Sequence, residues 1–208
     1  MSSPVRGSRP PGSVGRPGYD RDTLLAVAVE VFNERGYDGT SMGDLATRLG
    51  LSKSSIYHHV AGKSELLARA TDRALDALTA VTQEPATTTG PAIARLEHLV
   101  RRSVEVLVAE LPYVTLLLRV RGNTPVERRA LERRRELDAR VAALVRRAQD
   151  EGSLRPDVDP DLTARLVFGT VNSLVEWYRP GRGPRVSELA EAVLAHVLDG
   201  LRDPPSRC

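Results

Sequence analysis

The chain has 208 residues, of which 41% are hydrophobic and 4% aromatic, and its formal net charge is +3. These values predict a helix-rich protein of one large or two small domains, without the roughly 18 consecutive apolar residues of a membrane span. The N-terminal segment lacks the apolar core of a signal peptide, which predicts a cytoplasmic protein that does not contact a membrane. The one cysteine, Cys208, is the last residue, so neither a disulfide framework nor a thiolate metal cluster is expected.

Taken in chain order, the first region is a tail and the second is a group of short helices. Residues 1–18 are rich in proline, glycine, serine and arginine, which predicts a disordered basic tail. Apolar residues then recur at helical spacing, with Thr40 or Ser41 as the N-cap of the second helix, Ser52 as the N-cap of the third and Gly50 as a C-cap. The predicted helices cover residues 20–36, 41–50 and 52–59. Helices this short need neighbours, so the three should form one compact unit.

The remainder of the chain is also predicted to be helical. A longer amphipathic helix is expected over residues 63–82, and the segment 84–91, EPATTTGP, ends it. Further periodic segments cover residues 92–110, 112–121, 125–151, 161–178 and 185–201. No strand-like alternation is present, so the fold class is all-α. The expected regions are a tail at 1–18, a three-helix domain at 19–64, a helical-bundle domain at 65–202 and a second tail at 203–208.

The segment from Leu162 to Tyr178, LTARLVFGTVNSLVEWY, is apolar around most of its circumference. A surface helix should show one apolar stripe, so something must cover both sides of this helix. Together with the apolar positions of the last helix, it could form half of a four-helix interface in a two-fold symmetric homodimer. The alternative is the buried central helix of a monomeric bundle.

The segment between Ser41 and His59 matches the layout of a helix-turn-helix unit. The small residue Ala46 lets the two short helices approach, and Gly50 takes the turn. In such units the second helix enters the DNA major groove with its early residues at the base edges. Lys63 begins the next helix, where free backbone N–H groups already favour an anion. The candidate DNA-binding residues of the second helix are Lys53, Ser54, Ser55, Tyr57, His58 and His59.

Residues 36–67, GYDGTSMGDLATRLGLSKSSIYHHVAGKSELL, resemble the DNA-binding motif of TetR-family transcriptional regulators. The similarity covers about residues 20–70 and departs from the family at Val60, where phenylalanine is frequent. The resemblance implies that one group of residues contacts phosphates: Thr40, Ser41, Tyr57, His58 and Lys63. It places Lys53, Ser54 and Ser55 nearer to bases. Two alternatives remain, because the Tyr57 ring could pack in the small core, and Arg16 in the tail could reach a minor groove or stay solvated.

The resemblance also implies a C-terminal domain that binds a small-molecule effector and forms the dimer. Aromatic and aliphatic walls with a few polar groups suit small ligands, although such residues usually just fill a core. The candidate pocket residues are Tyr113, Leu117, Phe168, Asn172 and Trp177. Residues 151–178 are similar to family members that respond to acyl-CoA thioesters. Arginines within 119–147 could meet the phosphates of such a ligand, but interleaved acids, including a Glu136–Arg140 pair, favour a solvated, salt-bridged face.

These observations favour a ligand-responsive, homodimeric repressor that binds double-stranded DNA at a palindromic operator and needs no metal or cofactor. A helical hydrolase is an alternative, because Ser54 and His58, like Ser55 and His59, are four residues apart on a helix. No acidic residue lies within 45–64 to orient an imidazole, so the local sequence supplies two of the three roles of a catalytic triad. The other alternative is an all-α protein-interaction module that does not bind DNA.

Overall fold

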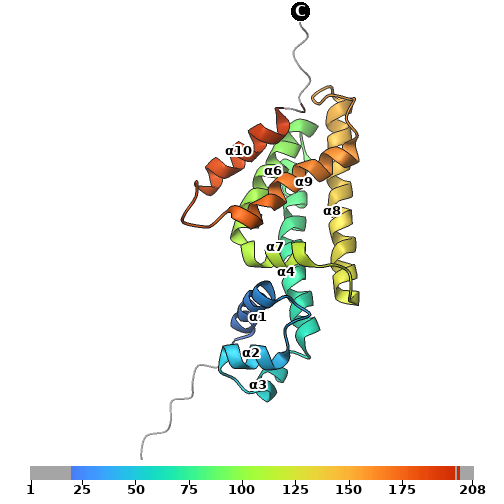
Figure 1. The fold of residues 1–208 in the computed structure, drawn as a ribbon. Helices are drawn as coiled ribbons and strands as arrows, with labels where there is room; N and C mark the ends of the chain where they lie inside the picture. The colour runs from blue at the N-terminus through green and yellow to red at the C-terminus, as the bar shows by residue number, and fades with distance from the viewer. Residues whose placement is uncertain (1–19, 200, 202–208) are drawn as a thin grey trace, which may run out of the picture.

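The computed structural model describes residues 20–199 and residue 201, and the ten elements that these residues form are all helices (Figure 1). The predicted all-α fold is confirmed. The helices are α1 (Arg21–Arg35), α2 (Met42–Leu49), α3 (Lys53–Tyr57), α4 (Lys63–Gln83), α5 (Pro85–Thr88), α6 (Ala92–Ala109), α7 (Leu111–Arg119), α8 (Pro125–Asp150), α9 (Pro160–Trp177) and α10 (Val186–Leu198). The tails predicted at 1–18 and 203–208 lie outside the described residues.

The N-terminal unit consists of α1, α2 and α3, and its helix ends follow from local sequence. At the start of α1, the Asp20 carboxylate accepts a hydrogen bond from the backbone N–H of Thr23 at 2.7 Å. Ser41 and Asp44 cap α2 reciprocally, each side chain accepting from the backbone N–H of the other. Gly50 ends α2 with φ at 63°, a left-handed conformation that glycine adopts without steric cost. The turn between α2 and α3 is therefore sharp and fixed.

The C-terminal bundle consists of α5 to α10 and most of α4. With 21 residues, α4 runs without interruption from the N-terminal unit into the bundle, so the predicted domain boundary at residues 64 and 65 falls in its first turn (Figure 1). The longest helix, α8, has 26 residues and packs against α4, α6 and α9, while α10 packs mainly against α6. One helix thus connects the two parts covalently.

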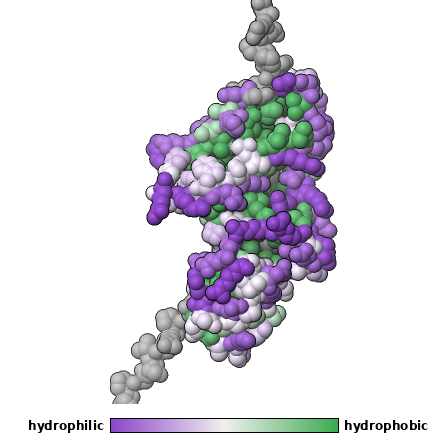
Figure 2. All heavy atoms as spheres, viewed as in Figure 1, coloured by the Kyte–Doolittle hydropathy of each residue, from purple (hydrophilic) through white to green (hydrophobic). Residues whose placement is uncertain are grey.

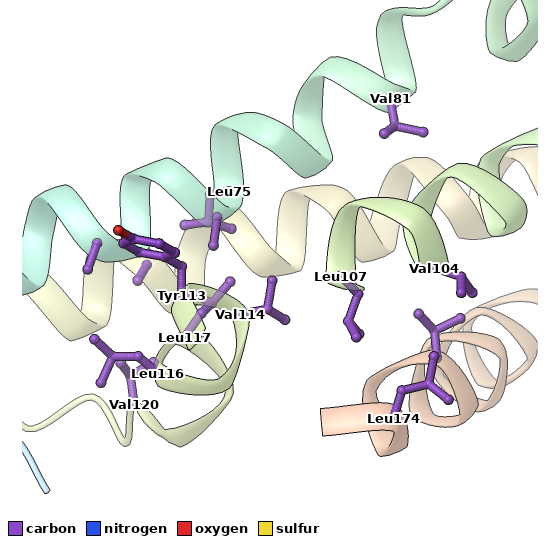
Figure 3. Close-up of a cluster of buried hydrophobic side chains, with 14 of the residues drawn as sticks. Leu75, Val81, Val104, Leu107, Tyr113, Val114, Leu116, Leu117, Val120 and Leu174 are labelled. Carbon is purple, nitrogen blue, oxygen red and sulfur yellow. The ribbon is translucent and has the colours of Figure 1, made fainter. Parts of the chain in front are cut away.

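The core is continuous from the N-terminal unit into the bundle. Figure 3 shows the part where α7 meets α4: Val114, Leu116 and Leu117 of α7 lie close to Leu75 of α4. All four side chains are at most 3% exposed. Movement of α7 relative to α4 would therefore open gaps between close-packed side chains, which costs free energy.

The structure departs from the predicted boundaries in two places. The segment predicted as a break after α4 contains the short helix α5, with Pro85 as its first residue, where a missing N–H costs nothing. The helix predicted through His59 ends at Tyr57, because the chain must turn there to enter α4. None of the helices within the described ranges is long and apolar enough to cross a lipid bilayer.

The outer face of α9 is exposed and apolar. Leu162 is 51% exposed, Leu166 61% and Trp177 55%, so α9 is not the fully buried central helix of the alternative prediction. Figure 2 shows hydrophobic side chains gathered over the part of the molecule that α9 crosses, with hydrophilic side chains around them. Large apolar side chains exposed together on one helix face indicate an interaction surface.

Candidate DNA-binding surface and effector cavity

Helix α3 is anchored by apolar side chains and exposes its polar ones. Ser52 caps it, with its Oγ accepting from the backbone N–H of Ser55 at 3.1 Å. Ile56 is fully buried and Val60 is 4% exposed, so these two side chains hold α3 and its end against the rest of the unit. Tyr57 is 52% exposed, which is inconsistent with the alternative in which its ring packs in the small core. Helix α3, which Tyr57 ends, lies at the end of the molecule away from the bundle (Figure 1).

The residues in and just after α3 that are predicted to contact DNA differ in how exposed their side chains are. Lys53, Ser54 and His58 are exposed, whereas His59 is half-buried. Ser55 is also half-buried, and its hydroxyl lies 2.9 Å from the hydroxyl of Ser52. Its side chain is therefore already engaged in the helix cap, which leaves Ser54 as the serine that presents a free side chain.

Thr40 and the N-cap residue Ser41, both predicted to contact phosphate, have side chains that are already hydrogen bonded. Thr40 is 2% exposed, and its hydroxyl donates to the carbonyl oxygen of Gly36 at 2.7 Å. The Thr40 side chain thus holds the turn before α2 and does not face solvent, contrary to the predicted contact. The Ser41 hydroxyl donates to the Asp44 carboxylate at 2.6 Å, and these hydrogen bonds lower the pKa of that carboxyl.

The Lys63 side chain, for which the resemblance implies a phosphate contact, is hydrogen bonded within the protein. Its ammonium group donates to the carbonyl oxygens of Tyr37 and Thr40, each at 3.0 Å. It also lies 4.4 Å from the centroid of the Tyr37 ring, a cation–π distance. Lys63 therefore ties the start of α4 to the turn between α1 and α2, and Tyr37 belongs to the site although sequence reasoning missed it.

The serines and histidines of α3 do not form a catalytic arrangement in the described part of the chain. No side-chain hydrogen bond connects Ser54 or Ser55 to His58 or His59 there, and only the His58 backbone N–H donates to the Ser54 carbonyl oxygen, at 3.2 Å. The Ser55 hydroxyl is engaged by Ser52. Within residues 20–199, no group of three or more histidine, cysteine or acidic side chains is arranged to hold a metal ion.

A cavity of about 50 Å³, partly open to solvent, lies between helices of the C-terminal bundle. Three of the predicted pocket residues line it: Leu117, Phe168 and Asn172. The other lining residues are Leu78, Thr82, Leu99, Ser103, Val114, Leu118, Arg134, Leu137, Asp138 and Val141. The walls thus come from α4, α6, α7, α8 and α9, and are mostly apolar with a few polar groups, as in small-molecule sites.

Two predicted pocket residues lie elsewhere. The guanidinium carbon of Arg73 lies 4.2 Å from the centroid of the Tyr113 ring, and Arg73 donates a hydrogen bond to the Tyr113 hydroxyl at 3.2 Å. Arg73 also binds both carboxylate oxygens of Glu110, at 2.7 and 3.1 Å, so Tyr113 is part of a contact between α4 and α7 (Figure 3). Trp177 lies on the exposed outer face of α9.

Sequence reasoning missed the most polar part of the cavity wall. Arg134 and Asp138 are one helical turn apart on α8, and both line the cavity. Burial raises the pKa of the Asp138 carboxyl, while the charges of Arg134 and Arg165 oppose this shift. The i, i+4 spacing places both on one face of a helix, but only the packing of α8 shows that this face is the inner one.

The arginine-rich helix α8 is salt-bridged, but with different partners from those predicted. Arg133 binds Asp72 at 2.7 Å and Asp76 at 2.6 Å, both on α4. Arg140 donates to the Thr82 hydroxyl of α4 at 3.2 Å and is not paired with Glu136 among the described contacts. These arginines connect α8 to the helix that leads to the N-terminal unit.

A helix-turn-helix unit with an exposed second helix, carried on a helical bundle, is an arrangement suited to DNA binding. Two family models match the chain. "Bacterial regulatory proteins, tetR family" matches residues 24–70, and "Tetracyclin repressor-like, C-terminal domain" matches residues 89–201. The chain belongs to the TetR family and is a DNA-binding transcriptional repressor.

Individual relatives agree with this assignment. The chain is 30% identical over 189 residues to the HTH-type transcriptional repressor KstR2 of Mycobacterium tuberculosis, covering 87% of this chain and 92% of KstR2. The crystal structure of SCO3833 from Streptomyces coelicolor A3, a TetR-family member, is 60% identical, with a TM-score of 0.83 over 88% of this chain and 92% of that chain. AibR in complex with isovaleryl coenzyme A and operator DNA is 21% identical, with a TM-score of 0.73 over 84% of this chain and 96% of that chain, and shares the fold.

Proposed function

We propose that the protein is a homodimeric repressor that binds a palindromic operator and leaves it when a small molecule enters the C-terminal bundle. The observation that carries the proposal is the exposure of Ser54, Tyr57 and His58 on a short helix whose position is fixed by the buried Ile56. Two such helices, related by a two-fold axis, would enter successive major grooves of the operator. Because the operator is chromosomal DNA, we expect the protein to act in the cytoplasm.

The proposed dimer forms through α9 and α10. Its support is the exposed apolar face of α9, with Leu162, Leu166 and Trp177, next to a groove of about 230 Å³ between α9 and α10. That groove is lined by Thr163, Leu166, Val167, Thr170, His196, Val197 and Leu201. A second copy of the same face would cover these side chains, which is how two-fold symmetric interfaces are built.

The proposed effector occupies the cavity lined by Leu117, Phe168 and Asn172, and an acyl-CoA thioester is the candidate class. The apolar walls suit an acyl chain, and Arg134 at the wall supplies a charge for an anionic group. AibR, which shares the fold, is described in complex with isovaleryl coenzyme A. The class is tested by thermal melting with acyl-CoA thioesters of increasing chain length, with free coenzyme A as the control.

The link from this cavity to the DNA-binding surface is proposed to run through α7 as well as α4. Helix α7 lines the cavity with Val114 and Leu117, and it also contacts α1. There the Asn33 side-chain amide donates to the carbonyl oxygen of Pro112 at 2.8 Å, and Arg119 donates to the Asn33 carbonyl oxygen at 2.5 Å. A ligand that displaced α7 would therefore shift α1, and with it the spacing of the two recognition helices.

Replacing Asn33 with alanine is expected to loosen this contact without removing DNA-contacting groups. The loss of affinity caused by inserting one base pair at the centre of the operator should become smaller than it is for the wild type. The measurement is binding by each protein to a selected operator and its inserted derivative, with the exposed Asn123→Ala as the control. An unchanged penalty for the insertion would show that α1 does not depend on the Asn33 contact.

Lys63→Ala is expected to reduce both folding stability and DNA affinity. The carbonyl oxygens of Tyr37 and Thr40 lose their donor, so the N-terminal unit should melt at a lower temperature. If the ammonium group also contacts a phosphate, affinity falls about equally for all sequences, and the slope of log K against log salt becomes shallower by about 0.9. A lower melting temperature with an unchanged salt slope would show that Lys63 stabilises the turn before α2 and does not contact a phosphate.

The experiment that tests the proposed function is selection of bound fragments from the source genome with the full chain. We expect enriched fragments that share a near-palindrome, and genes beside them would indicate the effector. Absence of any enriched sequence would favour the interaction-module alternative.

A further inference from the structure

Gly43, the second residue of α2, has an ordinary right-handed helical backbone and therefore does not need to be glycine for its conformation. Glycine inside a helix costs stability relative to alanine, so a reason for it must lie in the surroundings. A β-carbon added to Gly43 would lie 3.0 Å from Cε and 3.3 Å from Nζ of Lys53, and 3.3 Å from Oγ of Ser41. The space that a side chain would fill is thus occupied by the end of the Lys53 side chain.

The end of the exposed Lys53 side chain, which begins α3, thus lies against the start of α2. In helix-turn-helix proteins the first helix crosses the sugar–phosphate backbone and the second enters the groove. An ammonium group that lies against α2 is therefore on the side that faces the sugar–phosphate backbone in such complexes.

We propose that Gly43 is a positioning residue for operator binding, and that Lys53 contacts a DNA phosphate and does not read a base. The proposal rests on the proposed function, because it assigns roles within the DNA-binding surface. The missing side chain lets Lys53 lie against α2, where its position is restricted before DNA arrives. A lysine restricted in this way loses less conformational entropy when it binds a phosphate than one that extends freely into solvent.

The proposal predicts opposite effects of Gly43→Ala on binding and on folding. Affinity for every DNA fragment should fall by up to about tenfold, because the new methyl group displaces the lysine from its phosphate. The melting temperature should stay the same or rise, because alanine favours the helix and restricts the unfolded chain. A purely structural role for Gly43 would instead lower the melting temperature together with affinity.

Lys53→Ala should likewise lower the affinity for all DNA fragments about equally, and the slope of log K against log salt should become shallower by about 0.9. In the Lys53→Ala background, adding Gly43→Ala should cause no further loss of affinity. The measurements are binding isotherms at several salt concentrations for the two single variants and the double variant, with thermal melts of each. Undiminished affinity of Gly43→Ala, additive losses, or a changed base preference in Lys53→Ala would overturn the proposal. A wild-type protein that bound no fragment would instead refute the proposed function itself.

Discussion

Leu166→Glu is expected to convert the proposed dimer into monomers and to weaken operator binding by more than about 100-fold. Leu166 is 61% exposed on α9, and in the proposed dimer it becomes buried against the second copy. Burying two unpaired carboxylates at a two-fold interface costs several kcal/mol for each, which exceeds what an apolar contact contributes. A monomer binds only one half of the operator. It therefore lacks the additional affinity that a dimer obtains by binding both halves at once.

The measurements for Leu166→Glu are molar mass in solution and affinity for a selected operator. The matched control is Ala143→Glu, because Ala143 is also exposed but lies on α8, outside the apolar face of α9. We expect the control to remain dimeric and to bind DNA as the wild type does. A Leu166→Glu protein with the mass of a dimer would place the interface elsewhere.

Ile56→Ala is expected to unfold the N-terminal unit selectively and to abolish operator binding. Ile56 is fully buried and is the one buried side chain within α3, so its removal leaves a cavity beneath a helix of five residues. Truncating a buried isoleucine to alanine costs about 2–5 kcal/mol, a large share of the stability of so small a unit. The C-terminal bundle has its own buried side chains and should stay folded.

Circular dichroism and thermal melting would measure the effect of Ile56→Ala, together with DNA affinity and molar mass. We expect a new transition at lower temperature, an unchanged dimer and no detectable specific binding. Ser54→Ala is the control on the same helix: its side chain is exposed, so stability should be unchanged while operator preference alters. If Ile56→Ala kept its operator affinity, the position of α3 would not depend on the buried Ile56 side chain.

The sequence predicts well those features that depend on residues a few positions apart. Ser41 and Ser52 are the N-caps of α2 and α3, and Gly50 takes the left-handed turn between them, as their residue types indicate. The apolar circumference of α9 predicts two covered faces; the structure shows one face packed inside and the other exposed, so a cover for the second face stays a prediction. Such features follow from helix geometry and hydrogen bonding within a single turn.

The sequence does not predict contacts between residues far apart in the chain. Lys63 meets the carbonyl of Tyr37 across 26 residues, and Arg73 meets Tyr113 across 40. No local pattern marks either pair, so the sequence predicts a phosphate contact for Lys63 and a place in the pocket for Tyr113, and it predicts no role for Tyr37 or Arg73. Arg133 shows the same limitation, because its carboxylate partners lie on α4 and not on its own helix. Packing of helices selects these partners.

The small size of the cavity in the bundle sets a condition on any effector. A volume of about 50 Å³ accommodates little more than a few water molecules, whereas sites for organic ligands usually enclose about 300 Å³ or more. A molecule as large as an acyl chain can enter only by pushing apart the helices that surround it. Effector binding and distortion of the bundle would then occur together. The effector would weaken operator binding by as much as it binds the distorted state more tightly than the DNA-bound state.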